Sequence, residues 1–249
     1  MDRVKVLDAY IDNLGLNEII IKIRGFIKSG KPHAVITANS LMVNCITSDT
    51  SLKKAFKEAD LVVADSIGII WAAAYLGNPI CERIPGIDLM IKLCETAEKE
   101  NFRIYLLGAH DEIVKKAAES LQARFSSLDI AGTHNGYFTA PPDSDEEKEV
   151  IRSIKELRPD MLFVGMAIAI QERWINEHIY ELGVPVCMGI GGSFDVLSGR
   201  LNRAPLWFRR IGLEWIYRFF LQPWRFVRLL KLPVFVFKVF IQKHIRGRS

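Results

Sequence analysis

Between residues 30 and 190 the chain alternates short, continuous apolar runs with stretches of helical periodicity. The runs are Ala34–Thr37, Leu61–Ala64, Ile104–Leu107, Met161–Gly165 and Val186–Ile190. Helical patterns occupy residues 40–58, 67–76, 87–100, 111–125, 145–157 and 171–181. Strands buried on both faces form such runs, and their alternation with helices is typical of βαβ units. We therefore expect an α/β fold whose mostly parallel sheet carries helices on both faces.

Charge divides the chain into two parts. Residues 200–249 contain twelve Lys or Arg and one acid, Glu214, which gives this segment a net charge of +11 and leaves −7 for residues 1–199. The same segment holds 11 of the 25 aromatic residues. We therefore predict a Rossmann-like α/β domain over residues 1–199 and a basic, aromatic, helical appendage over residues 200–249. The whole-chain net charge of +4 averages two different surfaces and predicts no partner.

The appendage has the composition of a segment that lies on a membrane. Its helical patterns span Leu206–Leu221, Trp224–Lys231 and Val234–Ile245. Basic side chains beside Trp, Phe and Leu are typical of amphipathic helices at an anionic bilayer surface. Two other interpretations are helices that pack against the domain or another copy, and a nucleic-acid surface. The acidic domain argues against nucleic acid, so we expect none.

No stretch of the sequence predicts a membrane-spanning helix or a signal peptide. The most apolar candidate, Leu232 to Ile241, is short and is interrupted by Pro233 and Lys238. The first ten residues contain four charged side chains and lack the apolar centre of a signal sequence. We expect a cytoplasmic protein that attaches peripherally to the inner face of the cell membrane.

Small and polar residues follow each apolar run, where an open parallel sheet binds its ligands. They are Thr37 and Asn39, then Asp65, then Gly108, then Gly165 with Gln171 shortly after, and finally Gly189, Gly191 and Gly192. Any one of these loops is explained equally well by turns and helix caps. Together the five loops predict a ligand pocket.

Asp65 and Arg83 are the residues best suited to chemistry. Asp65 directly follows an apolar run, so its carboxylate is a general base, a ribose ligand or a helix cap. Arg83 lies in a loop punctuated by Pro85 and Gly86, where it either braces a diphosphate or pairs with Glu82.

The glycine-rich loop 189–193 is similar to a phosphate cradle, although it lacks the Lys-Ser/Thr pair of a P-loop. The histidines and the four cysteines show no ligand spacing. We therefore expect neither a metal site nor a cofactor.

Several motifs occur together in one order along nearly the whole chain. They are Thr37-x-Asn39, Asp65-Ser-Ile-Gly68, Glu82-Arg83-Ile-Pro-Gly86-x-Asp88-Leu89, Asn135-Gly-Tyr-Phe138, Gly165 with Gln171-Glu172-x-Trp174, Gly189-x-Gly-Gly-Ser-Phe-Asp195, Gly199-Arg200-x-x-Arg203-Ala-Pro205, Gly212-Leu-Glu214-Trp215-x-x-Arg218 and Pro223-x-Arg225. Each motif is weak alone, but the ordered set resembles the WecG/TagA/CpsF glycosyltransferases, and within them the N-acetylmannosaminyltransferases of wall teichoic acid synthesis.

The resemblance implies a metal-independent, inverting transfer. N-acetylmannosamine passes from a UDP-sugar donor to the 4-hydroxyl of the GlcNAc in a polyprenyl-diphosphate-linked acceptor at the cytoplasmic membrane surface. Asp65 would be the general base, and Thr37, Asn39, Arg83 and Gln171 would line the substrate pocket. The appendage would attach to the membrane and close over the site.

In that arrangement Arg218, Arg225 and Arg228 supply positive charge near the diphosphates. Their spacings of seven and three place them on one face of a continuing helix. The exposed apolar helices also predict a homo-oligomer that forms away from the membrane.

One segment departs from the family pattern. Where the family has a small residue, a proline and a basic residue before Gln-Glu, this chain has Ile168, Ala169 and Ile170. Two alternatives therefore stay open. The donor is another UDP-sugar, namely UDP-glucose or the uronate of UDP-ManNAc, or the protein is a nonenzymatic nucleotide-sugar or lipid-binding module.

Overall fold

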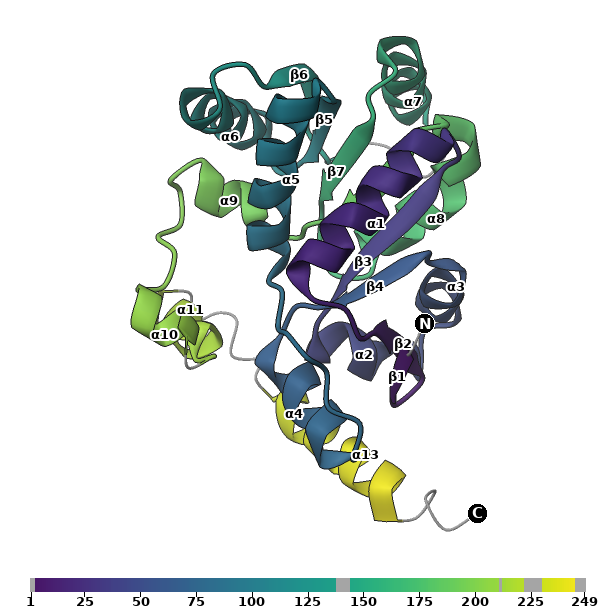
Figure 1. Ribbon diagram of the computed structural model, residues 1–249, viewed down its shortest axis with the longest axis vertical. Coiled ribbons are helices and arrows are strands. Elements are labelled where there is room, and N and C mark those ends of the chain that lie inside the picture. Colours follow the sequence, from purple (N-terminus) through teal and green to yellow (C-terminus); the bar gives the residue numbers. More distant parts are fainter. Residues whose placement is uncertain (1–2, 138–143, 211, 222–229, 245–249) are drawn as a thin grey trace.

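Six strands form one parallel sheet at the centre of the computed structural model, which describes residues 3–137, 144–210, 212–221 and 230–244 (Figure 1). In spatial order they are β4 (Leu61–Ala64), β3 (His33–Ala38), β8 (Val186–Gly189), β7 (Met161–Gly165), β5 (Arg103–Gly108) and β6 (Asp129–His134). Every neighbouring pair is parallel, so the carboxyl ends of all six strands meet at one edge. The expected α/β fold is confirmed.

Helices cover both faces of the sheet. One face carries α1 (Leu16–Ser29), α5 (Gly86–Glu100) and α6 (Asp111–Arg124), and the other carries α2 (Ser40–Ile46), α3 (Thr50–Glu58), α7 (Asp145–Leu157) and α8 (Ile170–Leu182). Alternate strand residues enter the two cores. In β4, Val63 packs with the α1 and α5 face, while Val62 packs with the α2 and α3 face. Burial on both faces explains why these strands have no polar alternation.

The apolar runs of the sequence do not predict the amino-terminal strands. Strands β1 (Arg3–Val6) and β2 (Ala9–Asp12) form an antiparallel hairpin. The buried Asp12 carboxylate accepts a hydrogen bond from the Val62 N–H at 2.8 Å and pairs with Arg3 at 3.2 Å. A buried carboxylate with these partners attaches the hairpin to the edge of the sheet beside β4.

Two further differences from the sequence pattern have local causes. Strand β6 is half-exposed at the other edge of the sheet, so it needs no continuous apolar run. The helical pattern at 40–58 is two helices, because Asp49 caps α3 by accepting from the Leu52 N–H at 2.9 Å.

The carboxyl-terminal segment contains α10 (Leu206–Arg210), α11 (Glu214–Leu221) and α13 (Lys231–His244). Figure 1 shows α13 beside α4 (Ile67–Tyr75), at the end of the molecule opposite β6. The Phe235 and Val239 side chains are fully buried in the core that α2 and α4 share. One face of α13 therefore packs against the domain, as one of the alternative interpretations of the appendage requires.

Polar contacts fix the middle and the carboxyl-terminal part of α13. The Gln242 Oε1 atom accepts from the Leu7 N–H at 2.8 Å, and the Lys238 ammonium donates to the Asn44 carbonyl at 3.0 Å. In the described ranges, none of the helices combines the length and hydrophobicity needed to cross a bilayer. The division at residue 199 stays a prediction, but α13 is part of the core.

Phe235→Ala should lower the free energy of unfolding by about 3 kcal/mol, because it leaves a cavity beneath α13. Phe237→Ala is the matched control, since the Phe237 side chain is 63% exposed on the same helix. It should change the free energy by less than about 0.5 kcal/mol. Urea denaturation of both variants tests this, and equal effects would contradict the docking of α13.

Candidate active site

The loops after β3 and β8 lie side by side at the carboxyl edge of the sheet. The buried Thr37 hydroxyl donates to the Gly189 carbonyl at 2.9 Å and joins the two strand ends. From there the chain turns to opposite faces, because α2 packs in one core and Phe194 of α9 (Ser193–Leu197) packs in the other. Such a reversal is the place where open α/β sheets bind ligands.

Gln171 holds the β7 and β8 loops together. Its Oε1 atom accepts from the Met166 N–H at 3.2 Å and from the Gly191 N–H at 2.9 Å. Its Nε2 atom donates to the Glu172 carboxylate at 2.6 Å. With the side chain 3% exposed, the structure places Gln171 inside the wall of the site. Its expected contact with substrate stays a prediction.

Glycine is required at two of the predicted positions by close packing. A Cβ atom on Gly189 would lie 2.5 Å from the Gln171 Nε2 atom. A Cβ atom on Gly108, where φ is +139°, would collide with the Gly165 carbonyl of the neighbouring strand. Gly191 lies in the left-handed region with φ of +54°, and Gly192 caps α9. These glycines let the backbones at the strand ends approach one another.

The Asp65 carboxylate lies next to the same edge. Its Oδ1 atom accepts from the Gly86 N–H at 2.7 Å, and its own N–H donates to the Ala38 carbonyl at 2.9 Å. Gly86 packs on Thr37, since a Cβ there would lie 3.1 Å from the Thr37 hydroxyl. The N-cap of α4 is Ser66, so capping of that helix is not the role of Asp65. Asp65 instead faces the first turn of α5.

Arg83 connects this edge to the carboxyl-terminal segment. Its Nη2 atom donates to the Arg209 carbonyl of α10 at 3.0 Å. The neighbouring Glu82 carboxylate accepts from the Leu16 N–H at 2.8 Å. A second contact nearby joins Arg203 to Asp88, at the start of α5, at 2.6 Å. Both arginines therefore hold the chain that follows α9 beside the Asp65 loop.

Among the remaining predicted residues, the structure describes the side chain of Asn39 but not those of the three arginines. Asn39 caps α2, because its Oδ1 atom accepts from the Leu41 and Met42 N–H groups at 3.0 and 3.1 Å. Arg218 lies in α11, but its side chain is outside the described part. Arg225 and Arg228 also lie outside the described residues. The expected positive charge from these arginines near a diphosphate stays a prediction.

Glu172 lies next to Gln171 at this edge of the sheet, and the sequence alone predicts no role for it. Its side chain is 2% exposed, and burial raises the pKa of the carboxyl from 4.5 to about 7. The Gln-Glu pair was visible in the sequence, but its burial was not. The preceding Ala169 has φ of +69°, a conformation closed to proline, so this turn differs from one with the family's usual proline.

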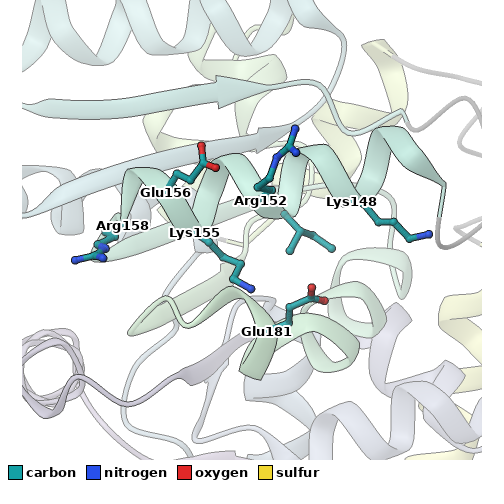
Figure 2. A pocket seen from close by; sticks show the side chains of 7 residues that line it. Lys148, Arg152, Lys155, Glu156, Arg158 and Glu181 are labelled. Carbon is teal, nitrogen blue, oxygen red and sulfur yellow. The ribbon is translucent and has the colours of Figure 1, made fainter.

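A surface depression of the domain lies elsewhere. It has a volume of about 510 Å³ on α7 and α8, and its charged lining residues are Lys148, Arg152, Lys155, Glu156, Arg158 and Glu181 (Figure 2). None of the predicted site residues lines it. Within the described ranges, no three His, Cys, Asp or Glu side chains gather where they could hold a metal ion. The expectation that no metal takes part stays a prediction.

Comparison with known proteins identifies the family of the chain. Residues 4–249 match the model of the glycosyl transferase WecG/TagA/CpsF family. The chain belongs to this family. An N-acetylglucosaminyldiphosphoundecaprenol N-acetyl-beta-D-mannosaminyltransferase of Staphylococcus aureus strain NCTC 8325 / PS 47 is 34% identical over 239 residues, which cover 95% of this chain and 92% of the relative. Its counterpart in strain MRSA252 is 33% identical with the same coverage.

The packing at this edge of the WecG/TagA/CpsF fold gives a direct test. Gly189→Ala should lower the free energy of unfolding by about 1–3 kcal/mol, because the new methyl group overlaps Gln171 and Glu172. Gly25→Ala is the control: this glycine lies in α1 with open space around its Cβ position. It should raise the free energy by about 0.5–1 kcal/mol. Thermal or urea denaturation of both variants decides, and a neutral Gly189→Ala would contradict the packing.

Proposed function

We propose that the protein transfers N-acetylmannosamine from UDP-ManNAc to the GlcNAc of undecaprenyl-diphosphate-GlcNAc, as in the synthesis of the wall teichoic acid linkage unit. The relatives that share 34% of their residues with nearly the whole chain carry a name that describes transfer of this sugar. The observation that carries the proposal is the position of Asp65, held at the carboxyl edge between Ala38 and Gly86 and next to Thr37.

The reaction needs a base at this edge. The 4-hydroxyl oxygen of the acceptor GlcNAc attacks the anomeric carbon of the donor and forms the new glycosidic bond, while the bond from that carbon to the β-phosphate oxygen breaks. The hydroxyl proton passes to the Asp65 carboxylate, and UDP leaves with the bonding electron pair. Attack opposite the leaving group inverts the anomeric centre. A carboxylate beside the binding edge is suited to this proton transfer.

The departing UDP needs fixed positive charge or backbone donors. Arg83 is suited to this role because its guanidinium is always charged and offers several N–H groups in a planar fork. Its contact with the Arg209 carbonyl holds it at the junction of the site and α10. In the glycine-rich loop the N–H groups of Ile190, Gly191 and Ser193 already donate within the protein, so this loop offers fewer backbone donors than its composition predicts. We assign Arg218, Arg225 and Arg228 a supporting role toward the same diphosphates.

A membrane-bound acceptor explains the apolar surface of the carboxyl-terminal segment. Large apolar side chains that remain exposed around α4 belong to Ile67, Trp71, Leu206, Trp207, Phe220, Val234, Phe237 and Phe240. Gly212 packs on Ile67, and Phe235 lies near Gly68, so α10, α11 and α13 all approach α4. Exposed apolar side chains together with basic residues favour peripheral attachment at the inner face of the membrane. Away from a membrane, the same surface favours self-association.

Asp65→Asn should lower kcat for transfer by about 10²–10⁴-fold, because the amide cannot accept the hydroxyl proton. The assay is release of UDP from UDP-ManNAc with a lipid-diphosphate-GlcNAc acceptor. Asp111→Asn, which alters an exposed carboxylate paired with Lys115 on α6, serves as the control and should leave kcat unchanged. Undiminished turnover by Asp65→Asn would remove Asp65 as the base.

Replacing both Trp207 and Phe220 by Ser should weaken binding to phosphatidylglycerol vesicles by about tenfold or more, since each aromatic ring inserts apolar area into the bilayer surface. Tyr180→Ser removes a more exposed ring from α8, on the domain, and should have no effect. Vesicle co-sedimentation measures both variants. Equal binding by all three proteins would contradict attachment through α10 and α11.

A further inference from the structure

Two buried neighbours, Gln171 and Glu172, form a chain of hydrogen bonds with a fixed direction. The Met166 and Gly191 N–H groups donate to the Gln171 Oε1 atom. The Gln171 Nε2 atom donates to Glu172 Oε1 at 2.6 Å, and the Ala169 N–H donates to Glu172 Oε2 at 3.0 Å. Because the Met166 and Gly191 N–H groups are donors, the oxygen of the Gln171 amide, and not its NH₂ group, faces the loops.

This arrangement requires a side chain at position 172 that accepts at both of its oxygens. Both partners of Glu172, the Gln171 amide and the Ala169 backbone, are donors. An ionised carboxylate accepts from both. A glutamine amide or a protonated acid would instead point an N–H or O–H hydrogen at one of these donors and lose that hydrogen bond. If the Gln171 amide turned over to relieve that conflict, its NH₂ group would face the Met166 and Gly191 N–H groups. A buried chain of this kind fails as a unit when one member changes.

We propose that ionised Glu172 is a positioning residue of the active site: it orients Gln171, which in turn holds the β7 and β8 loops at the spacing needed for transfer. The inference rests on the proposed function, because the loops it positions are those of the proposed donor site. Gly189 supports the assignment, since its missing side chain leaves room for both Gln171 and Glu172. The Thr37 hydroxyl then joins the Gly189 carbonyl to β3, next to Asp65.

The positioning is sensitive to pH in the neutral range. Burial raises the pKa of Glu172 to about 7 despite the hydrogen bonds from Gln171 and Ala169, which favour the ionised form. The charged group that acts on it is Arg173, whose Nε atom donates to the Ala169 carbonyl and whose guanidinium lies 3.7 Å from Asp49. Since the folded-state pKa lies above the ordinary value, the proton returns as the pH falls through about 7, and the loops then lose their fixed spacing.

The test is a double-mutant cycle at positions 171 and 172 in the full-length protein. Glu172→Gln places two donors face to face and should lower kcat at pH 8 by about tenfold or more. Gln171→Glu should also lower it, because it places two carboxylates together. The combined variant reverses the direction of the hydrogen bond between side chains 171 and 172. The carboxylate now at position 171 accepts from both loops and from the NH₂ group of the amide at position 172. The oxygen of that amide accepts from the Ala169 N–H. The kcat of the combined variant should be at least about tenfold higher than that of Glu172→Gln.

Glu147→Gln is the matched control. Glu147 is also buried, and it accepts from the Trp174 indole N–H at 2.7 Å between α7 and α8. This variant should leave the pH profile of kcat unchanged, whereas Glu172→Gln should remove the part of the profile with a midpoint near pH 7. A combined variant no better than Glu172→Gln alone, or an unchanged kcat in Glu172→Gln, would overturn the proposal.

Amide hydrogen exchange separates this inference from the proposed function. The Met166 and Gly191 N–H groups should exchange faster in Glu172→Gln than in the parent, and the combined variant should restore their protection. If protection follows this pattern while the parent protein transfers no sugar, the positioning holds and the proposed function fails. If protection of these two groups is the same in all variants, the positioning role is wrong even where transfer is observed.

Discussion

Parallel pairing of β3 with both β4 and β8 is the constraint on which the site depends. The registers Thr37 opposite Val63 and Val35 opposite Met188 bring the ends of three strands to one level. The chain segments that follow these strands are far apart in sequence, and only the sheet brings Asp65, Thr37 and Gly189 to one edge. The Thr37–Gly189 hydrogen bond and the Gln171 bridge then fix the separation of the loops.

Much of this arrangement could be predicted because apolar runs mark strands that are buried on both faces. The five runs correspond to β3, β4, β5, β7 and β8, and the parallel sheet brings the loops after them to one edge, where their binding of a ligand stays a prediction. Strand β6 and the β1–β2 hairpin were missed since edge strands tolerate polar residues. The burial of Gln171 and Glu172 was also out of reach, because a Gln-Glu pair near a helix start is ordinarily exposed. Tertiary contacts with the glycine-rich loop decide their environment.

The appendage packs partly against the domain and leaves part of its apolar surface exposed. Phe235 and Val239 bind one face of α13 to the domain, while Phe237 and Phe240 remain exposed on the same helix. One helix thus belongs to the core and also contributes apolar surface. Arg83 extends this connection to α10, so the segment that we assign to the membrane is in contact with the loop that precedes α5, and the Gly86 N–H at the end of that loop donates to Asp65. A lipid-linked acceptor would meet the enzyme at this junction.

The most direct test of the central claim is a donor screen with the unaltered full-length protein and a lipid-diphosphate-GlcNAc acceptor. UDP-ManNAc, UDP-glucose and the uronate of UDP-ManNAc are compared at equal concentration, and the lipid product is identified by mass. The predicted result is a single product that gains one N-acetylhexosamine, formed from UDP-ManNAc. Transfer from another donor in preference would contradict the assigned substrate, and binding of UDP without transfer from any donor would contradict the assignment as an enzyme.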